Sequence, residues 1–388
     1  MLIEEIKLHD FRNYGELTLH PHPGVNLLFG QNGSGKTNLL EAVHYCALGR
    51  SHRTSLDREV VRKGEDMAAV GVTVRGENSR CQIAVKLTPG ESRKKQVYLD
   101  LKRASRLSDL MGRLQCVIFS PEDLMIVKEG PAIRRRFVDM MLSQLSSSYF
   151  VALQQYSKAL EQRNAILRQC KKSGKTDAGM IAVFEEAMAA PSQVIIPMRR
   201  KILALTAEIA AEQYRAISGR PEEAFSMRYT ACLEGEDIPE RMRRQWEQGR
   251  REDMLRGTTG FGIHREDLAL TLHGREMKLF ASQGQIRTAA LSMKLAQLEV
   301  CRQVTGNTPV LLLDDVMSEL DMTRRTRLLK EISGVQTFVT CTDESDMDGC
   351  DDRRSYRVRM AAEGTASISE TSSGQPVPAR TIEDPDFS

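Results

Sequence analysis

The chain has 388 residues, a formal net charge of +3, 41% hydrophobic residues and 28% charged residues. A single core stops growing at roughly 250–300 residues, so we expect several domains or one large α/β head with an insertion. The composition is that of a globular protein, the small net charge excludes a polycation that binds nucleic acid along its whole length, and we find no apolar run near the roughly 20 residues of a membrane span.

The N-terminal residues carry acids and lack the basic, apolar and small-residue order of a signal peptide, which predicts a cytoplasmic protein. Residues 1–30 read as two strands joined by a loop rich in proline and glycine. The second strand ends in an apolar run at residues 25–29, and a helical pattern follows residue 38 and ends near Gly49.

The letters between that strand and that helix, GQNGSGKTN, fit the P-loop pattern G-x-x-x-x-G-K-[ST] without deviation. Glycines allow the backbone to turn tightly and aim its N–H groups at a triphosphate, and the helix N-terminus adds partial positive charge. We expect Lys36 to reach the β and γ oxygens of ATP and to serve catalysis, and Thr37 to bind Mg²⁺. The alternative is a glycine-rich turn without a ligand. The predicted nucleotide-binding residues of this loop are Gly30, Gln31, Asn32, Gly33, Ser34, Gly35, Lys36, Thr37 and Asn38.

The middle of the chain changes from strands to helices. Residues 68–101 contain two or three β-rich runs that predict an antiparallel sheet, and residues 116–120 form a further strand. From Pro131 onward apolar residues recur at four-residue steps, which predicts helices. We expect the last long helix, near residues 180–217, to be bent or split by Pro191 and Pro197.

Acidic residues follow an apolar strand in the second half of the chain, in the stretch TPVLLLDDVMSELD. Asp314 stands where a Walker B carboxylate helps to hold Mg²⁺, and Asp315 is placed to orient or deprotonate the attacking water. Aspartate is one methylene shorter than glutamate at this position, so we expect slow turnover. A helix N-cap is the alternative explanation of the acid pair.

Residues 282–285, with the sequence SQGQ, precede a helix and come roughly thirty residues before the acid pair. They resemble the signature of ATP-binding-cassette proteins, in which a serine and glycine amides bind the γ-phosphate of ATP held by the other subunit. The letters SELD at residues 318–321 resemble the D-loop of the same proteins. This resemblance implies half of an ATP sandwich and assigns Ser282, Gly284 and Gln285 to nucleotide binding.

The order of these motifs predicts an α/β fold: an ATP-binding-cassette head, with a mixed central sheet and an antiparallel sheet, into which a mainly helical arm is inserted. We expect residues 1–130 and 257–361 to form the head and residues 131–256 to form the arm. Residues 362–388 are rich in Ser, Thr, Glu and Pro without periodicity, and we expect them to be disordered.

Further motifs resemble the RecF family of recombination and gap-repair ATPases. They are LHDFRNY, GQNGSGKTNLLEA, GRSHRT, FSPEDL, GPAIRRRFVD, QRN, HRED and SQGQ, which extend from Leu8 to about Asp343. HRED departs from the family pattern, which usually shows two aspartates. The resemblance implies that Arg12 and Asn13 contact the nucleotide, whereas a packed strand end with a surface arginine is the alternative.

The RecF resemblance implies an ATP-dependent homodimer that clamps DNA, prefers double-stranded, gapped or junction DNA over single strands, and acts with RecO and RecR to load RecA. It also implies weak, DNA-stimulated ATP hydrolysis that needs ATP and Mg²⁺ and acts as a timer. No pattern shows which basic cluster contacts DNA.

Two other functions remain open. The subunit of a membrane transporter would carry a histidine after its last strand, where this chain has Thr340, Cys341 and Thr342. An interaction module would hold its nucleotide without hydrolysing it.

Overall fold

The computed structural model describes residues 1–77, 79–90, 95–347, 350, 352–361 and 364–371. Contacts divide the chain into two compact units. The first contains residues 1–123, 216–219 and 297–388, and the second contains residues 124–215 and 220–296. Residues 257–296 therefore group with the helical unit, and the boundaries that we expected between head and arm stay a prediction.

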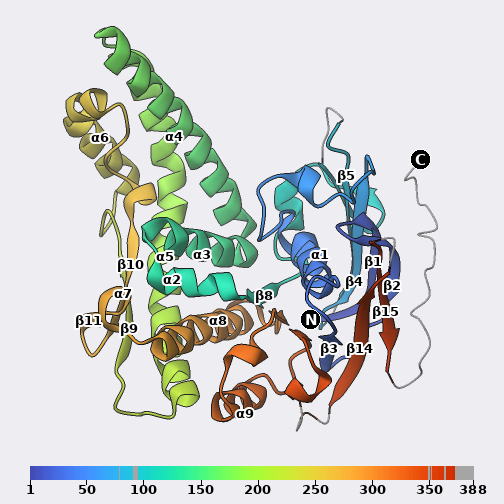
Figure 1. The fold of residues 1–388 in the computed structure, drawn as a ribbon. Coiled ribbons are helices and arrows are strands. Elements are labelled where there is room, and N and C mark those ends of the chain that lie inside the picture. The colour runs from blue at the N-terminus through green and yellow to red at the C-terminus, as the bar shows by residue number, and fades with distance from the viewer. Residues whose placement is uncertain (78, 91–94, 348–349, 351, 362–363, 372–388) are drawn as a thin grey trace. The chain divides into compact units, whose positions relative to one another are not determined.

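An antiparallel sheet of the first unit has the strand order β2-β1-β4-β5-β6-β7 (Figure 1). Its strands are β1 Leu2–Phe11, β2 Tyr14–Leu19, β4 Ala68–Arg75, β5 Arg80–Leu87, β6 Lys95–Leu99 and β7 Lys102–Arg103. The sheet expected from residues 68–101 is confirmed. The expectation of two strands before residue 30 is wrong, because the chain turns at Arg12, whose φ is 58°, and forms a hairpin of β1 and β2 before the next strand.

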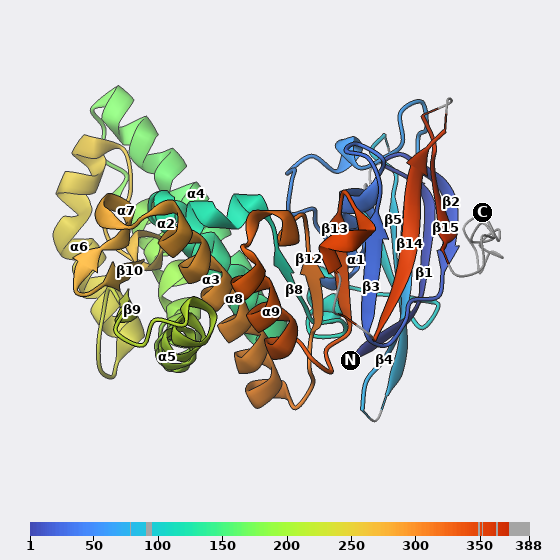
Figure 2. The ribbon, with the colours of Figure 1, turned by 60° about the horizontal axis from the view of Figure 1, so that its bottom comes forward.

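A mixed sheet of the same unit has the order β15-β14-β3-β13-β12-β8 (Figure 2). Its strands are β3 Val25–Phe29, β8 Cys116–Phe119, β12 Val310–Leu313, β13 Thr337–Cys341, β14 Arg353–Met360 and β15 Ala366–Glu370. The four strands β3, β13, β12 and β8 run parallel and are buried along their whole length. Their nearly continuous apolar sequences are typical of parallel strands covered on both faces.

Helix α1, Lys36–Leu48, packs against β1, β4 and β5 of the antiparallel sheet and against β8 and β13 of the mixed sheet. It buries eleven of its thirteen residues, as expected of a helix between two sheets. Its C-terminus at Gly49, with φ 64°, lies where the sequence predicts. Helix α9, Met322–Glu331, also belongs to this unit.

Strand β15 lies inside the segment that we expected to be disordered, so for residues 366–370 that expectation is wrong. The segment pairs antiparallel with β14 and buries Ala366 and Ile368. These two apolar side chains, on one face of the strand, stabilise a segment whose overall composition is polar. Of the expected disordered segment, residues 362–363 and 372–388 lie outside the described residues.

The second unit is mainly helical and contains one small sheet of order β11-β10-β9. Its helices are α2 Met125–Lys128, α3 Pro131–Leu145, α4 Ser147–Ser173, α5 Ala178–Ser218, α6 Ile238–Arg256, α7 Met277–Phe280 and α8 Gln283–Thr305. Residues 216–218 of α5 and 297–305 of α8 are grouped with the first unit. Its strands are β9 Phe225–Thr230, β10 Asp267–Leu272 and β11 Arg275–Glu276.

Helix α5 continues through Pro191 and Pro197, so the expected split does not occur. Each proline removes one backbone hydrogen bond, and the buried side chains of Ile195, Ile196 and Leu203 hold the helix against its neighbours in compensation.

Buried arginines hold the helices of the second unit together. Arg163 of α4 is fully buried, and its guanidinium donates to Glu185 at 2.8 Å and to Asp253 at 2.7 Å. Arg199 of α5 likewise donates to Asp139 at 2.6 Å and to Glu266 at 2.5 Å. Removing one partner of such a buried ion pair costs roughly 3–5 kcal/mol, because the remaining charge stays buried.

By length and composition alone α5 could cross a membrane, since an 18-residue window of it reaches a mean hydropathy of 1.2. Our expectation that no segment approaches such a span is therefore wrong for α5. This is weak evidence for a membrane helix, because core helices pass the same test. The ion pairs of Arg199 with the neighbouring Asp139 and Glu266 are those of a core helix.

Candidate functional site

The loop between β3 and α1 adopts backbone conformations that favour glycine. Gly30, Gly33 and Gly35 have φ angles of 146°, 80° and 115°. A Cβ at Gly30 would lie 2.2 Å from the carbonyl oxygen of Val358, and one at Gly35 would lie 2.8 Å from Asn13 Nδ2. Only glycine fits both positions, so the loop has the tight curvature that phosphate binding requires.

Lys36 begins α1 and folds back over the loop. Its ammonium donates to the carbonyl oxygens of Gly30 at 2.5 Å and Gln31 at 2.9 Å, and the residue is 7% exposed. Burial lowers the pKa of Lys36, an effect that the charges of Asp315, Cys341 and Asp314 oppose. Among the described residues no carboxylate forms an ion pair with this buried ammonium, and a phosphate would supply a close anionic partner.

The end of β12 meets the start of α1 through hydroxyl and carboxylate groups. The hydroxyls of Thr37 and Thr340 each donate to Asp314 Oδ1 at 2.8 Å. Burial raises the pKa of Asp314, and the two hydroxyl hydrogen bonds oppose that rise. A hydroxyl oxygen next to a carboxylate suits Mg²⁺, which prefers oxygen ligands. Water and phosphate oxygens would supply most of the other ligands. The described residues contain no cluster of three or more His, Cys, Asp and Glu side chains that would hold a metal without such help.

Asp315 follows with a φ of 53°, a left-handed conformation that is uncommon outside glycine, asparagine and aspartate. Its backbone N–H donates to Thr340 Oγ1 at 2.8 Å. Ser318 Oγ donates to its carbonyl oxygen at 2.9 Å and to its carboxylate at 3.2 Å. Three contacts of 2.8–3.2 Å therefore hold this acid beside Asp314, in a backbone conformation that aspartate tolerates better than most residues.

The turn between β1 and β2 contacts the same loop. Asn13 Nδ2 donates to the carbonyl oxygen of Ser34 at 3.2 Å, and Asn38 Nδ2 donates to Asn13 Oδ1 at 2.8 Å. Tyr14 OH donates to the carbonyl oxygen of Gly35 at 3.1 Å. The buried hydroxyl of Ser34 has no hydrogen-bond partner among the described residues, as expected of a group that awaits a ligand.

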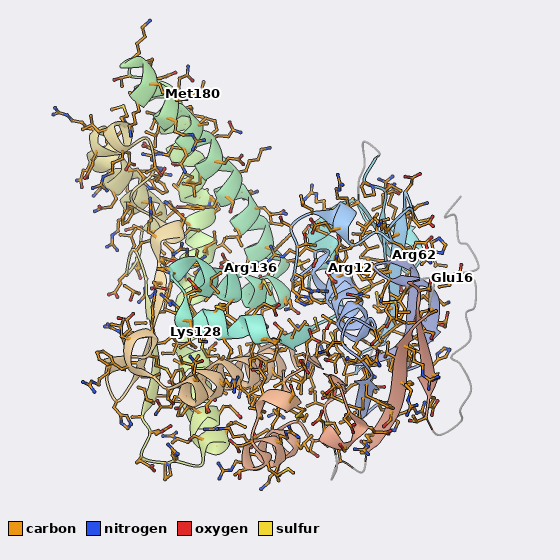
Figure 3. The ribbon with its side chains drawn as sticks, in the orientation of Figure 1. Arg12, Glu16, Arg62, Lys128, Arg136 and Met180 are labelled. Atoms are coloured by element: carbon orange, nitrogen blue, oxygen red, sulfur yellow. The ribbon has the colours of Figure 1, made fainter. Side chains whose placement is uncertain are left out.

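Glu41 is a central residue of this region that the sequence reading missed. Its fully buried carboxylate accepts two hydrogen bonds from Arg12, at 2.7 and 2.9 Å, and one from Ser51 at 2.5 Å. Figure 3 labels Arg12 among the side chains of the first unit. Arg53 NH1 lies 3.4 Å from Glu41 and donates to Asn38 at 3.0 Å. Burial alone would raise the pKa of Glu41, but the hydrogen bonds from Arg12 and Ser51 and the charges of Arg12 and Arg53 hold it below its usual value. A charged residue within the apolar pattern of α1 was the available signal.

The SQGQ residues form the start of α8 in the second unit. Ser282 N–H donates to Gln285 Oε1 at 2.9 Å, and Gln285 N–H donates to Ser282 Oγ at 3.3 Å, which is a reciprocal helix cap. Gln285 also donates to Glu223 Oε1 at 3.0 Å. Ser282 and Gln283 are exposed, and Gly284 is half-buried. The helix N-terminus therefore presents backbone N–H groups that suit an anion.

The structure thus brings the predicted residues together in two groups. The first unit contains the P-loop, Arg12, Asn13, Asp314 and Asp315, and the second contains Ser282 to Gln285. The basic run at residues 134–136 is partly structural, because Arg134 pairs with Asp267 at 2.7 Å and Arg135 donates to the carbonyl oxygen of Glu266 at 2.8 Å.

Comparison with known proteins supports one family. The model of the RecF/RecN/SMC N terminal domain matches residues 2–367. A DNA replication and repair protein RecF from Ruminiclostridium cellulolyticum is 38% identical over 349 residues, which are 89% of this chain and 93% of that protein. A protein of the same name from Lactobacillus delbrueckii subsp. bulgaricus is 40% identical over 351 residues, 88% of this chain and 91% of that protein.

Solved structures agree. The recombination mediator protein RecF with ATPrS, described as part of the RecFOR pathway, superposes with a TM-score of 0.85 and 32% identity, covering 95% of this chain and 98% of that chain. RecF with ATP from the same pathway gives a TM-score of 0.84 and 33% identity over 95% and 97% of the two chains. An Smc head bound to a ScpA domain, with a TM-score of 0.55 and 16% identity over 95% and 97%, shares the fold of an ATP-binding-cassette head.

Proposed function

Because the chain belongs to the RecF family of DNA replication and repair proteins, we propose that it is an ATP-dependent DNA-binding protein of recombinational repair and replication restart. The observation that carries this proposal is the contact between the P-loop and the acidic strand end, where Thr37 Oγ1 lies 2.8 Å from Asp314 Oδ1. These two groups belong to segments 277 residues apart, and Mg²⁺-dependent nucleotide binding explains why they meet.

The loop residues divide the work of binding ATP. Lys36 exchanges its carbonyl contacts for the β and γ oxygens, and Ser34 and the backbone N–H groups of residues 31–36 surround the phosphates. Thr37 and Asp314 hold the Mg²⁺, which neutralises phosphate charge when it is bound. Arg12 and Asn13 approach the nucleotide from the hairpin turn, and Glu41 orients Arg12 through its two hydrogen bonds.

Asp315 orients the attacking water and accepts its proton. Ser318 contacts its carboxylate and Thr340 accepts from its backbone N–H, but its short side chain leaves a longer path to the γ-phosphate than glutamate would. We therefore expect slow hydrolysis, which would limit how long the ATP-bound state lasts rather than drive repeated movement along DNA.

The N-terminus of α8 serves the nucleotide of a second copy. Ser282, Gly284 and Gln285 bind the γ-phosphate of ATP held by the partner, so that ATP closes a homodimer around DNA and hydrolysis releases it. The protein binds double-stranded, gapped or junction DNA more strongly than single strands, and acts with RecO and RecR to load RecA at single-strand gaps. It works in the cytoplasm, at the nucleoid, without a membrane partner.

The test is the rate of ATP hydrolysis with and without a gapped duplex, for the wild type, Ser282→Arg and a control, Ser173→Arg, at the exposed end of α4. We expect DNA to stimulate the wild type and the control, and Ser282→Arg to bind ATP but lose hydrolysis. Full hydrolysis by Ser282→Arg contradicts the shared site.

A membrane-transporter subunit is the alternative, because such subunits carry the same order of P-loop, signature and acid pair as this chain. It predicts co-purification with integral membrane proteins and a hydrolysis rate that DNA does not change.

A further inference from the structure

The small sheet of the second unit has an open edge at β9. This strand pairs with β10 and with no other described strand. The backbone N–H of His273 donates to the carbonyl oxygen of Ala224 at 2.9 Å, which makes these two residues a hydrogen-bonded pair. Such pairs alternate along an antiparallel ladder, so Ser226 and Arg228 also direct their backbone groups at β10. The N–H and C=O groups of Met227 and Tyr229 therefore point away from β10.

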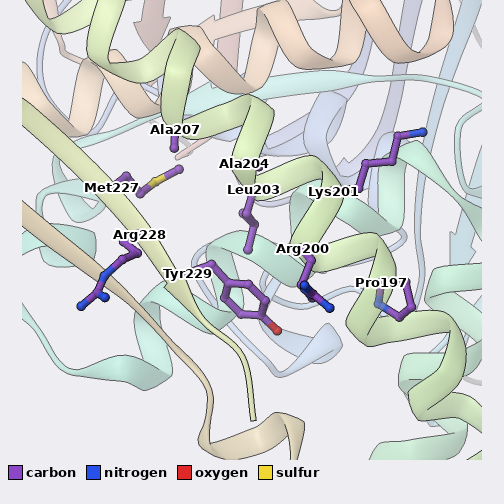
Figure 4. Close-up of a pocket in the computed structure, with 9 residues that line it drawn as sticks. All are labelled: Pro197, Arg200, Lys201, Leu203, Ala204, Ala207, Met227, Arg228 and Tyr229. Carbon is purple, nitrogen blue, oxygen red and sulfur yellow. The ribbon is translucent and has the colours of Figure 1, made fainter. Parts of the chain in front are cut away.

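A groove of about 610 Å³ lies between this edge and helix α5 (Figure 4). Three consecutive residues of β9, Met227, Arg228 and Tyr229, line it. Successive side chains of a strand point to opposite faces, so a groove lined by three in a row meets the edge of the strand. Met227 and Tyr229 extend toward α5 and Arg228 extends away from it, as this geometry requires.

The groove is cationic and has an apolar floor. Arg200 and Lys201 of α5 and Arg228 of β9 are exposed, and among the described residues that line the groove none is acidic. No described residue forms an ion pair with these three cations, whereas the adjacent Arg199 is buried and paired with two acids. The floor is formed by buried apolar side chains, including Leu203.

We propose that this groove binds an extended, acidic segment of a partner protein, which adds as a strand to the edge of β9. Strand addition satisfies the outward backbone groups of Met227 and Tyr229. In the added strand alternate side chains face opposite ways, so the carboxylates on the side of α5 reach Arg200 and Lys201. Nucleic acid matches the groove less well, because phosphate contacts use neither an apolar floor nor a strand edge. The proposal depends on neither ATP binding nor DNA binding.

The test is fluorescence anisotropy of the purified full chain with a labelled eight-residue peptide of alternating Glu and Val. The double variant Arg200→Glu with Lys201→Glu is compared with Lys158→Glu with Arg168→Glu, which makes the same charge change on exposed positions of α4 outside the groove. We expect the groove variant to bind the peptide at least about ten-fold more weakly, and the control to bind like the wild type.

Two further peptides examine the strand edge. In each, every second amide is N-methylated, in one of the two possible registers, so that only one register can still donate to β9. We expect one methylated peptide to bind and the other to fail, and a Gln–Val peptide to bind more weakly than the Glu–Val peptide.

The proposal is overturned if the wild type does not bind the Glu–Val peptide, if both methylated registers bind equally, or if the groove variant binds like the wild type. It is also overturned if the groove variant loses affinity only for a twenty-nucleotide DNA strand, because the groove is then a phosphate site. Circular dichroism and unchanged ATP binding establish that the variant is folded, and Lys201→Glu alone replaces it if it is not.

Discussion

Replacing Glu41 by glutamine tests the buried network beside the P-loop. The substitution keeps the size of the side chain and removes its charge. The carboxylate is 0% exposed and accepts hydrogen bonds from Arg12 and Ser51, with Arg53 at 3.4 Å. Arg12 Nη2 and Ser51 both donate to Oε1, and Arg12 Nε donates to Oε2, so a glutamine with its oxygen at Oε1 turns its NH2 group toward the Arg12 Nε–H donor and loses that bond.

A hydrogen bond to a charged group contributes about 1.5–3 kcal/mol, and breaking a fully buried ion pair costs about 3–5 kcal/mol. The Arg12 side chain is 19% exposed and that of Arg53 is 40% exposed, so water compensates part of the loss. We therefore expect Glu41→Gln to lower the free energy of unfolding by about 2–4 kcal/mol at pH 7. If Glu41 also orients Arg12 toward ATP, KM for ATP rises more than kcat falls.

The measurement is urea unfolding of both proteins between pH 8 and pH 3. The folded protein lowers the pKa of Glu41, so its stabilisation is present above the unfolded pKa, about 4.3, and is lost as pH falls through the folded pKa. The difference between the proteins should be constant down to about pH 5 and should shrink below about pH 4. Glu4→Gln is the control, because Glu4 also contacts two arginines but is 31% exposed, and we expect a change below about 1 kcal/mol. Equal stability of Glu41→Gln and wild type at pH 7 refutes the reasoning.

Four other substitutions have clear expected outcomes. Lys36→Arg should reduce ATP binding or hydrolysis at least about ten-fold, because the longer planar guanidinium does not fit between the carbonyl oxygens of Gly30 and Gln31. Unchanged ATP affinity and unchanged hydrolysis rate would contradict this. Asp315→Asn should bind ATP, hydrolyse it at least about a hundred-fold more slowly and accumulate as a dimer in gel filtration; normal turnover removes its role as base. Arg163→Met should lower the free energy of unfolding by about 3–5 kcal/mol, because it leaves Asp253 buried without its cation and Glu185 with Arg250 alone, whereas removing the exposed Arg243 should change it less; equal melting curves contradict this. Gly35→Ala should weaken ATP binding at least about ten-fold, because its φ of 115° and the contact of 2.8 Å with an asparagine exclude a Cβ; calorimetry showing wild-type affinity is the contrary result.

Local patterns allowed the nucleotide-binding elements to be predicted. The strand before the P-loop, the helix from Lys36 to Gly49 and the strand before Asp314 each follow from residues adjacent in sequence. The meeting of Thr37 and Asp314 is different, since it depends on β3 and β12 lying in one parallel sheet, and it was expected only because the two motifs occur together.

Features set by distant contacts escaped prediction. The sequence shows Glu41 as one acid in an apolar helix, and its importance depends on Arg12 and Ser51 from other elements. The residues of strand β15 have the composition of a polar tail, and only their pairing with β14 makes them a strand. Helix α5 continues through two prolines because burying its apolar face contributes more free energy than the loss of two backbone hydrogen bonds costs.

The most direct test of the account is sedimentation of the purified chain at two salt concentrations, with and without ATP, Mg²⁺ and a gapped duplex. We predict a single copy without nucleotide, and two copies bound to the duplex when ATP and Mg²⁺ are present, with DNA affinity that falls as salt rises. A chain that remains a single copy at saturating ATP, Mg²⁺ and duplex would contradict the shared ATP site on which the proposed DNA clamp depends.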